Sequence, residues 1–382
     1  MLGVGASVVS SIHLSKNNIK AARINSTLAL IAIVLVVTLF LALTLPSITG
    51  TARLLGSSEH LLPYARQYMP WCFLTCLFTG LSVIGLFVIR LDGSPRYAMW
   101  CNVLPGLLNI VLDWLFIFSL DMGIEGAAIA TLISCAVGAL MVLVYLFRFA
   151  RVLKPIRIKR SLRSLQLSLR NLGYQCKIGI SALLGETTMG MLMLLGNLVF
   201  MHYMGDDAVG AFSIACYYCP FVFMIGNAIA QSAQPILSYN YGLGAKTRVV
   251  ATERLAIFTA FGCGLTVTLA FCLMPDIMVA LFLPLDTPAA QIAVAGLPWF
   301  STAFVFFIFN LTAIGYFQSI EKVIPSIVFA LLRGAVFLIP AFVLLPVVLG
   351  HNGIWLALGA SEVATSLAIV CYYLYQHKKL GR

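Results

Sequence analysis

Charge-poor stretches of membrane-crossing length follow one another along nearly the whole chain, and they constrain its fold more than any other feature. A bilayer core about 30 Å thick is crossed by a helix of about 20 apolar residues. Only 10% of the 382 residues are charged and 61% are hydrophobic, whereas soluble domains carry roughly 25% charged residues. The period-2 alternation of an outer-membrane barrel is absent. The sequence therefore predicts an all-α polytopic membrane protein.

Ten apolar runs are long enough to cross a membrane, and one further run is partial. The partial run is Met1 to His13. The full spans are Ile24 to Ser47, Gln67 to Ile89, Tyr97 to Leu120, Gly126 to Phe147, Gln175 to Tyr203, Ala208 to Ser238, Leu255 to Pro275, Ala289 to Ser319, Val323 to Leu349 and Gly353 to Gln376. We expect an N-terminal lobe over residues 1–150, a basic linker over 151–174 and a C-terminal lobe over 175–382.

The connections between spans alternate in charge. All but two of the 24 Lys and Arg residues, the exceptions being Arg53 and Arg66, fall in alternate connections or at the C-terminus. Short loops rich in Lys and Arg stay on the cytoplasmic side. We therefore expect a multi-pass protein of the cytoplasmic membrane with a cytoplasmic C-terminus. The same placement explains the net charge of +11 without nucleic-acid binding.

The linker over 151–174 has two interpretations, because apolar residues are spaced among its charges. It is either an amphipathic helix on the anionic inner leaflet or a solvated connection between the lobes. Neither interpretation makes it a catalytic element.

The chain matches itself at a shift of 227 to 228 residues. Pro70-Trp71 falls on Pro298-Trp299, and Gly123 falls on Gly350. Both copies cross the membrane in the same direction, which predicts two parallel-repeat helical bundles. Residues 175–226 have no partner in the first copy, so one helix and part of another are expected to be missing. Either the chain starts at an internal Met or it is a natural short form.

Three carboxylates are predicted to lie within spans: Asp113, Glu186 and Glu362. Placing a charged side chain at this depth in the bilayer costs at least about 2.5 to 3.5 kcal/mol of free energy. Gly190, Met193 and Asn197 share a helix face with Glu186, because they follow it by 4, 7 and 11 residues. Glu186 is a candidate proton carrier or ligand of sodium or a cationic drug. The alternative is a Glu paired with a polar group on a neighbouring helix.

Amides in the later spans are further candidates. Asn227, Gln231 and Gln234 form a polar stripe that must face protein or a wet cavity, and interhelical hydrogen bonding is its alternative interpretation. Asn310 lies among phenylalanines and tyrosines, which attract organic cations but also pack in cores.

The remaining polar groups carry weaker predictions. Asp113 lies near the outer end of its span, where a structural hydrogen bond is expected, and the role of Glu362 is open. Arg333 is expected to snorkel to the inner surface. The five His residues form neither a metal site nor a nucleophile-base arrangement, and no phosphate-binding Gly-rich loop is present. We expect no metal, no cofactor and no enzymatic activity.

Four segments of the chain resemble recurring segments of the multidrug and toxic compound extrusion (MATE) family. They are GVGASVVSSIHLSKNNIKAA, NIVLDWLFIFSLDMGIEGAAIAT, QPILSYNYGLG and GYFQSIEK, and the second is the most specific. The resemblance implies two six-helix lobes, of which about 11 helices are present here, and efflux of amphipathic cations in exchange for sodium or protons. It also implies that Glu186 occupies the position of a glutamate that couples transport to a cation in the family. Some members have a coupling aspartate at another position, where this chain has Phe307.

Our hypothesis is a monomeric antiporter that works by alternating access, with Glu186 exchanging a cation for a drug cation. Met193, Asn197, Gln231, Gln234 and Asn310 would line its cavity. A lipid-linked oligosaccharide flippase or polysaccharide exporter of the same superfamily is the nearest alternative, and a nonfunctional fragment is another. The physiological substrate and the choice between sodium and protons do not follow from the sequence.

Overall fold

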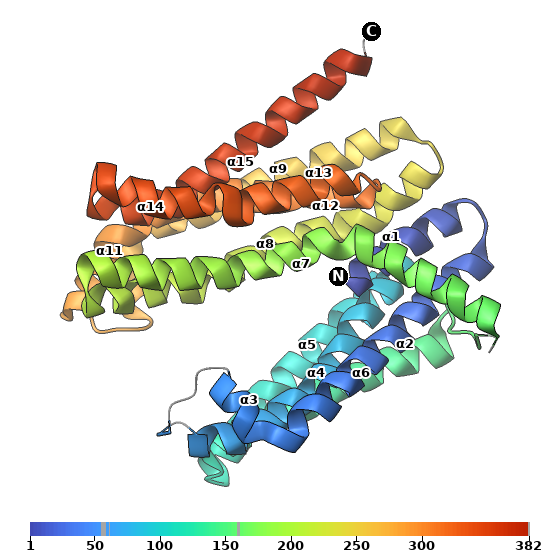
Figure 1. Ribbon diagram of the computed structural model, residues 1–382, viewed down its shortest axis with the longest axis horizontal. Helices are drawn as coiled ribbons and strands as arrows, with labels where there is room; N and C mark the ends of the chain where they lie inside the picture. Colours follow the sequence, from blue (N-terminus) through green and yellow to red (C-terminus); the bar gives the residue numbers. More distant parts are fainter. Residues whose placement is uncertain (55–58, 61, 159–160, 381–382) are drawn as a thin grey trace. The chain divides into compact units, whose positions relative to one another are not determined.

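The computed structural model describes residues 1–54, 59–60, 62–158 and 161–380, with side chains through Tyr375. The chain divides into two compact units, Met1–Lys177 and Ile178–Arg382. Every regular element in the described part is helical (Figure 1). This confirms the predicted all-α class.

Unit 1 is a bundle in which α4 packs against α2 and α6, while α5 lies against α6 and α1 against α2 (Figure 1). A short 3-10 turn joins α2 to α3, and π-helical turns end the spans that begin with α5 and α6. The elements are α1 (Leu2–Ser15), α2 (Ile19–Thr44), η1 (Leu45–Ser47), α3 (Ile48–Leu54), α4 (Leu62–Leu91), α5 (Pro95–Asp113), η2 (Trp114–Ser119), α6 (Gly123–Val144) and η3 (Tyr145–Phe149).

Unit 2 has α12 at its centre, in contact with α8, α9 and α15. The helix α7 begins within unit 1 and continues into unit 2. The elements are α7 (Leu162–Met204), α8 (Asp206–Gly242), α9 (Lys246–Leu273), α10 (Pro275–Ala280), α11 (Pro288–Ser301), α12 (Ala303–Ser319), α13 (Val323–Leu331), η4 (Leu332–Val336), α14 (Leu338–Leu349) and α15 (His351–Leu380).

The described helices account for the predicted spans. Nine are long and apolar enough to cross a membrane, and the pair α11 and α12 makes a tenth if it is one span bent by 44°. The sequence predicted a single span from Ala289 to Ser319. Its bend follows Pro298, which lacks an amide hydrogen and crowds the preceding turn. The predicted partial span is the short helix α1.

Large apolar side chains are exposed along these helices, as expected for a surface that faces lipid. Leu43 is 70% exposed in α2, Phe258 is 75% exposed in α9 and Val348 is 76% exposed in α14. Apolar exposure on this scale marks a membrane or protein contact, because soluble monomers rarely carry large apolar patches.

The backbone repeats where the sequence repeats. Residues with positive φ recur at the same shift in both units, and such angles are uncommon for residues other than glycine. The matching pairs are Asn17 with Gly244, Gly93 with Glu321, and Gly123 with Gly350. Equivalent helices in the two units are therefore joined by equivalent turns.

The start of the predicted linker is fixed to unit 1 by Asp92, which is only 8% exposed. Its carboxylate accepts hydrogen bonds from the backbone N–H groups of Arg151, Val152 and Leu153 at 2.7 to 2.9 Å. The Tyr145 hydroxyl donates a further bond of 2.9 Å. The later part of the segment belongs to α7, which begins at Leu162.

Replacing Asp92 with Asn should lower the free energy of unfolding by about 2 to 3 kcal/mol, because four donors then share one neutral oxygen. Denaturant unfolding of the detergent-solubilised protein measures this loss. Glu59→Gln is the matched control, since Glu59 pairs with Arg53 where both side chains are mostly exposed and such pairs contribute little. Equal effects of the two changes would contradict the anchoring role of Asp92.

Candidate functional site

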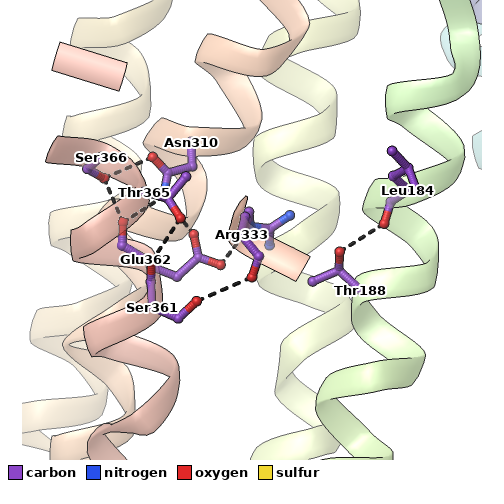
Figure 2. Close-up of polar contacts among 8 residues, drawn as sticks. All are labelled: Leu184, Thr188, Asn310, Arg333, Ser361, Glu362, Thr365 and Ser366. Atoms are coloured by element: carbon purple, nitrogen blue, oxygen red, sulfur yellow. Dashed lines mark hydrogen bonds and ion pairs between the residues drawn. The ribbon is translucent and has the colours of Figure 1, made fainter. Parts of the chain in front are cut away.

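A buried polar cluster lies in unit 2 where α12, η4 and α15 meet (Figure 2). The Arg333 Nε donates a hydrogen bond of 2.6 Å to Glu362 Oε1, and the Asn310 Nδ2 donates one of 2.7 Å to Glu362 Oε2. The Arg333 and Glu362 side chains are each 1% exposed. Both carboxylate oxygens of Glu362 are therefore matched by donors on other helices.

Further contacts hold these three residues in place. Ser366 donates a 2.9 Å hydrogen bond to Asn310 Oδ1, and Ser361 donates one of 3.2 Å to the Arg333 carbonyl oxygen (Figure 2). The guanidinium carbon of Arg333 lies 4.0 Å from the centre of the Phe307 ring. One nitrogen, Arg333 Nη2, is buried without a hydrogen-bond partner among the described residues. The Phe307 ring is thus in position to stabilise the charge by a cation–π interaction.

Electrostatics explains why these residues occur together. A lone charge at this depth is costly in hydrocarbon, and a buried pair offsets part of its desolvation only when its remaining polar atoms are also bonded. Glu362 meets that condition fully and Arg333 partly. Removing one partner therefore leaves an uncompensated charge inside the unit.

The segment that carries Arg333 is a π-helical turn, η4, between α13 and α14. Such turns hold one more residue than an α-helical turn and are frequent at functional sites. The next residue, Gly334, packs directly on α7, where a Cβ atom would lie 2.3 Å from Thr188 Oγ1. Thr188 in turn bonds to the Leu184 carbonyl (Figure 2). The cluster and α7 are therefore in close contact.

Glu186 lies on this same part of α7 but on its exposed side. Gly190 and Asn197 are also exposed and Met193 is half-buried, so the predicted line of side chains is a continuous accessible strip. It runs between the face that packs on unit 2 and an apolar exposed face formed by Leu183, Leu194 and Leu198. The polar strip is thus separate from the face of exposed leucines, whose apolar surface is compatible with contact with lipid.

The predicted stripe on α8 is less exposed. Asn227 and Gln231 are half-buried, whereas Gln234 is 3% exposed. Neither amide atom of Gln234 has a hydrogen-bond partner among the described residues. Leaving a buried amide unpaired costs about 1 to 3 kcal/mol per group. This position is therefore one that a polar group from elsewhere would stabilise.

Asp113 is the last residue of α5 and belongs to unit 1. It is half-buried, and its Oδ1 atom has no hydrogen-bond partner among the described residues. No group of three or more His, Cys, Asp or Glu residues in the described part could hold a metal ion.

The prediction for Arg333 is wrong. It was expected to snorkel, but it is the tenth residue after Val323 in its span, about 15 Å along the helix, and its side chain pairs with Glu362.

The aromatic residues around Asn310 largely form a packed core. Phe304 and Phe307 are each 1% exposed, and the rings of Phe271 and Phe304 lie 5.3 Å apart.

Comparison with known proteins identifies the fold and the family. The family model described as MatE matches residues 1–115 and 182–344, and the chain belongs to this family. As a member of this family, the protein is a multi-pass membrane transporter and not an enzyme.

Curated relatives and solved structures agree with this assignment. The multidrug export protein MepA of Staphylococcus aureus is 25% identical over 379 residues, which cover 99% of this chain and 82% of that protein. A MOP superfamily transporter from Pyrococcus furiosus has a TM-score of 0.88 at 22% identity. The outward-facing conformation of a multidrug resistance MATE family transporter has a TM-score of 0.88 at 21% identity. Each alignment covers 100% of this chain and 84% of the solved chain, and these likenesses show the fold.

A double-mutant cycle on the buried pair tests its energetics. Arg333→Met and Glu362→Met should each lower the free energy of unfolding by about 3 to 5 kcal/mol, because each leaves the other charge buried and unmatched. The double variant should lose much less than the sum of the two. Denaturant unfolding in detergent gives all three values, and strictly additive losses would show that the pair is not coupled.

Proposed function

We propose that this protein exports amphipathic cations, in antiport with sodium or protons, by alternating access of its two lobes. Three findings support this proposal: its membership of the MatE family, its similarity to MepA and the accessible acid on α7. The protein acts as a monomer in the cytoplasmic membrane, with small amphipathic cations as substrates and no cofactor besides the coupling ion.

The observation that carries the proposal is the contrast between two carboxylates of unit 2. Glu362 is fully buried, and its oxygens are bonded to Arg333 and Asn310. Glu186 is exposed on a strip that also carries an amide and a thioether. Because the charge of Glu362 is already matched within the protein, the exchange of a mobile cation falls to Glu186.

The strip on α7 provides the chemistry that an amphipathic cation requires. Glu186 supplies charge, Asn197 supplies hydrogen bonds, and Met193 supplies a flexible, polarisable apolar surface. On α8, Asn227, Gln231 and Gln234 add amides. Asn310 acts through Glu362, because it is fully buried and its amide bonds to that residue. Asp113 is a candidate relay carboxylate of the other lobe.

The C-terminus lies in the cytoplasm in this proposal, as the basic connections require. Arg90, Lys246 and Lys322 lie at or between helix ends on that side. Lys159, Arg160, Lys378, Lys379 and Arg382 contribute to the same charge asymmetry but have side chains outside the described residues.

Replacing Glu186 with Gln should abolish ion-gradient-driven efflux of ethidium, because the variant can neither release a proton nor balance a bound cation. The measurement is ethidium efflux in proteoliposomes with an imposed pH gradient or an imposed sodium gradient. The gradient that drives efflux in the unmodified protein identifies the coupling ion.

Two control variants separate transport from folding. Thr187→Val changes the next residue of α7, which is exposed, and Asp207→Asn removes an exposed carboxylate at the start of α8. Both should insert and transport like the unmodified protein. Unchanged efflux in Glu186→Gln would remove this residue from the mechanism, and efflux independent of either gradient would refute antiport.

A further inference from the structure

A cavity lies within unit 2 where α8 ends and α9 begins, and none of Asn310, Arg333 and Glu362 lines it. Its volume is about 540 Å³, which falls within the usual range for ligand pockets. The walls come from α8, α9, α12, α15 and the connection that precedes α13. Its charged groups are Lys246, Glu253, Arg254 and Lys322. We refer to it as the α9 pocket.

The charges of the α9 pocket favour an anion. Three cationic side chains face one carboxylate, Glu253, which is 9% exposed. Burial lowers the pKa of the Lys322 ammonium, and the Glu253 carboxylate acts in the opposite direction. Glu253 and Lys322 therefore interact electrostatically and balance each other. The exposed side chains of Lys246 and Arg254 are left to attract a negative group.

The pocket also has an aromatic wall. The ring centres of Tyr316 and Phe317 lie 5.3 Å apart, and those of Phe317 and Tyr373 lie 5.2 Å apart. Tyrosine combines an apolar ring with a polar hydroxyl and therefore suits a ligand that is partly apolar and partly polar. A small inorganic anion would leave this wall unused.

The internal repeat shows what occupies the corresponding place in unit 1. Five residues of the α9 pocket correspond, at the shift of 227 to 228, to residues of one apolar cluster of unit 1. The pairs are Tyr241 with Leu14, Val249 with Ala22, Ile257 with Leu30, Tyr316 with Val88, and Tyr373 with Leu146. In unit 1 this cluster includes Leu153, which is 1% exposed.

Unit 2 lacks the groups that hold Leu153 and its neighbours in place. In unit 1, Asp92 accepts the backbone N–H groups of residues 151–153, and Arg23 Nε donates to the Val152 carbonyl. The counterpart of Asp92 is Ile320, whose side chain has no hydrogen-bonding group, and the counterpart of Arg23 is Val250. The α9 pocket therefore resembles the unit 1 site but cannot hold a peptide segment in the same way.

An exposed apolar ridge leads from the pocket along α9. Phe258, Phe261 and Leu265 follow Arg254 at spacings of 4, 7 and 11 residues, which places them on one face. They are 75%, 42% and 53% exposed, on a helix apolar enough to cross a membrane. A ligand with its charge at Arg254 could therefore lay an acyl chain along this ridge.

We propose that the α9 pocket binds an anionic phospholipid, with the phosphodiester at Lys246 and Arg254, the glycerol against Tyr316 and Tyr373, and an acyl chain along Phe258. This site differs from the strip that carries Glu186 and does not depend on which ion drives transport. Lysine and arginine bind phosphate by charge and hydrogen bonds, and the exposed ridge supplies the apolar contact.

Native mass spectrometry of the full chain in detergent tests the proposal with short-chain phosphatidylglycerol as the probe. The double variant Lys246→Gln/Arg254→Gln should weaken binding about tenfold, since each partly screened charge contributes roughly a factor of three. Glu253→Gln should strengthen binding, because it frees the Lys322 charge. Arg248→Gln is the matched control, an exposed cation in the first turn of α9 that does not line the pocket.

The outcomes separate a lipid site from other kinds of site. Two results together would show that the pocket binds cations, and the proposal would then fail. The first is that Glu253→Gln weakens the binding of a trimethylammonium amphiphile. The second is that Lys246→Gln/Arg254→Gln leaves the binding of phosphatidylglycerol unchanged. An equal effect of Arg248→Gln would show general surface attraction and would also refute it. Thermal unfolding of each variant confirms that it is folded, and Tyr373→Phe provides a milder second variant that should reduce phosphatidylglycerol affinity.

Discussion

A charge inside a membrane must be matched within the protein, and this constraint organises unit 2. Glu362 lies on α15, Arg333 on η4 and Asn310 on α12, so matching one carboxylate joins three separate segments. Two serines of α15 hold the partners of Glu362 in place: Ser361 donates a hydrogen bond to the Arg333 carbonyl oxygen, and Ser366 donates one to Asn310 Oδ1. Since hydrocarbon offers no competing donors or acceptors, each of these bonds has no solvent alternative. Of the two carboxylates that the sequence predicts within spans of unit 2, Glu362 is ion-paired, whereas Glu186 lies on the exposed face of α7 with no ion pair among the described residues.

Much of the fold could be predicted from the sequence because lipid restricts the possible structures so strongly. Apolar length located the spans, and the shift between Gly123 and Gly350 located equivalent turns. Candidate residues such as Asn310 and Glu362 could be recognised because polar groups are rare in apolar runs. Their pairing could not, since Glu362 is 29 residues from Arg333 and 52 from Asn310 along the chain. The prediction for Arg333 failed because this residue lies ten residues beyond Val323 along its helix, where its guanidinium is matched by Glu362 and not by the membrane surface. The break between α11 and α12 was missed because both halves are equally apolar.

The two repeats share their helices and turns but differ in the residues that fill the space between equivalent helices. At corresponding places, unit 1 has Leu146 and Val88 in an apolar cluster that includes Leu153, whereas unit 2 has Tyr373 and Tyr316 in the wall of a cavity. The difference follows from one residue in particular: Asp92 supplies the charged acceptor that fixes the segment after α6, and its counterpart Ile320 has no polar side chain. A duplicated framework therefore preserves helices and turns while allowing the spaces between them to diverge.

The π-helical turn at η4 has a geometric consequence for the charge that it carries. A π-helical turn accommodates one residue more than the α-helical turns on either side. If this turn tightened to an α-helical one, the surplus residue would have to pass into α13 or α14, and the side chains it passed would turn by about 100° around the helix axis. Arg333 lies within that turn, and Gly334 lies against Thr188 of α7. A one-residue slip in the backbone would thus rotate the guanidinium away from Glu362 while the ends of the span stayed where they are.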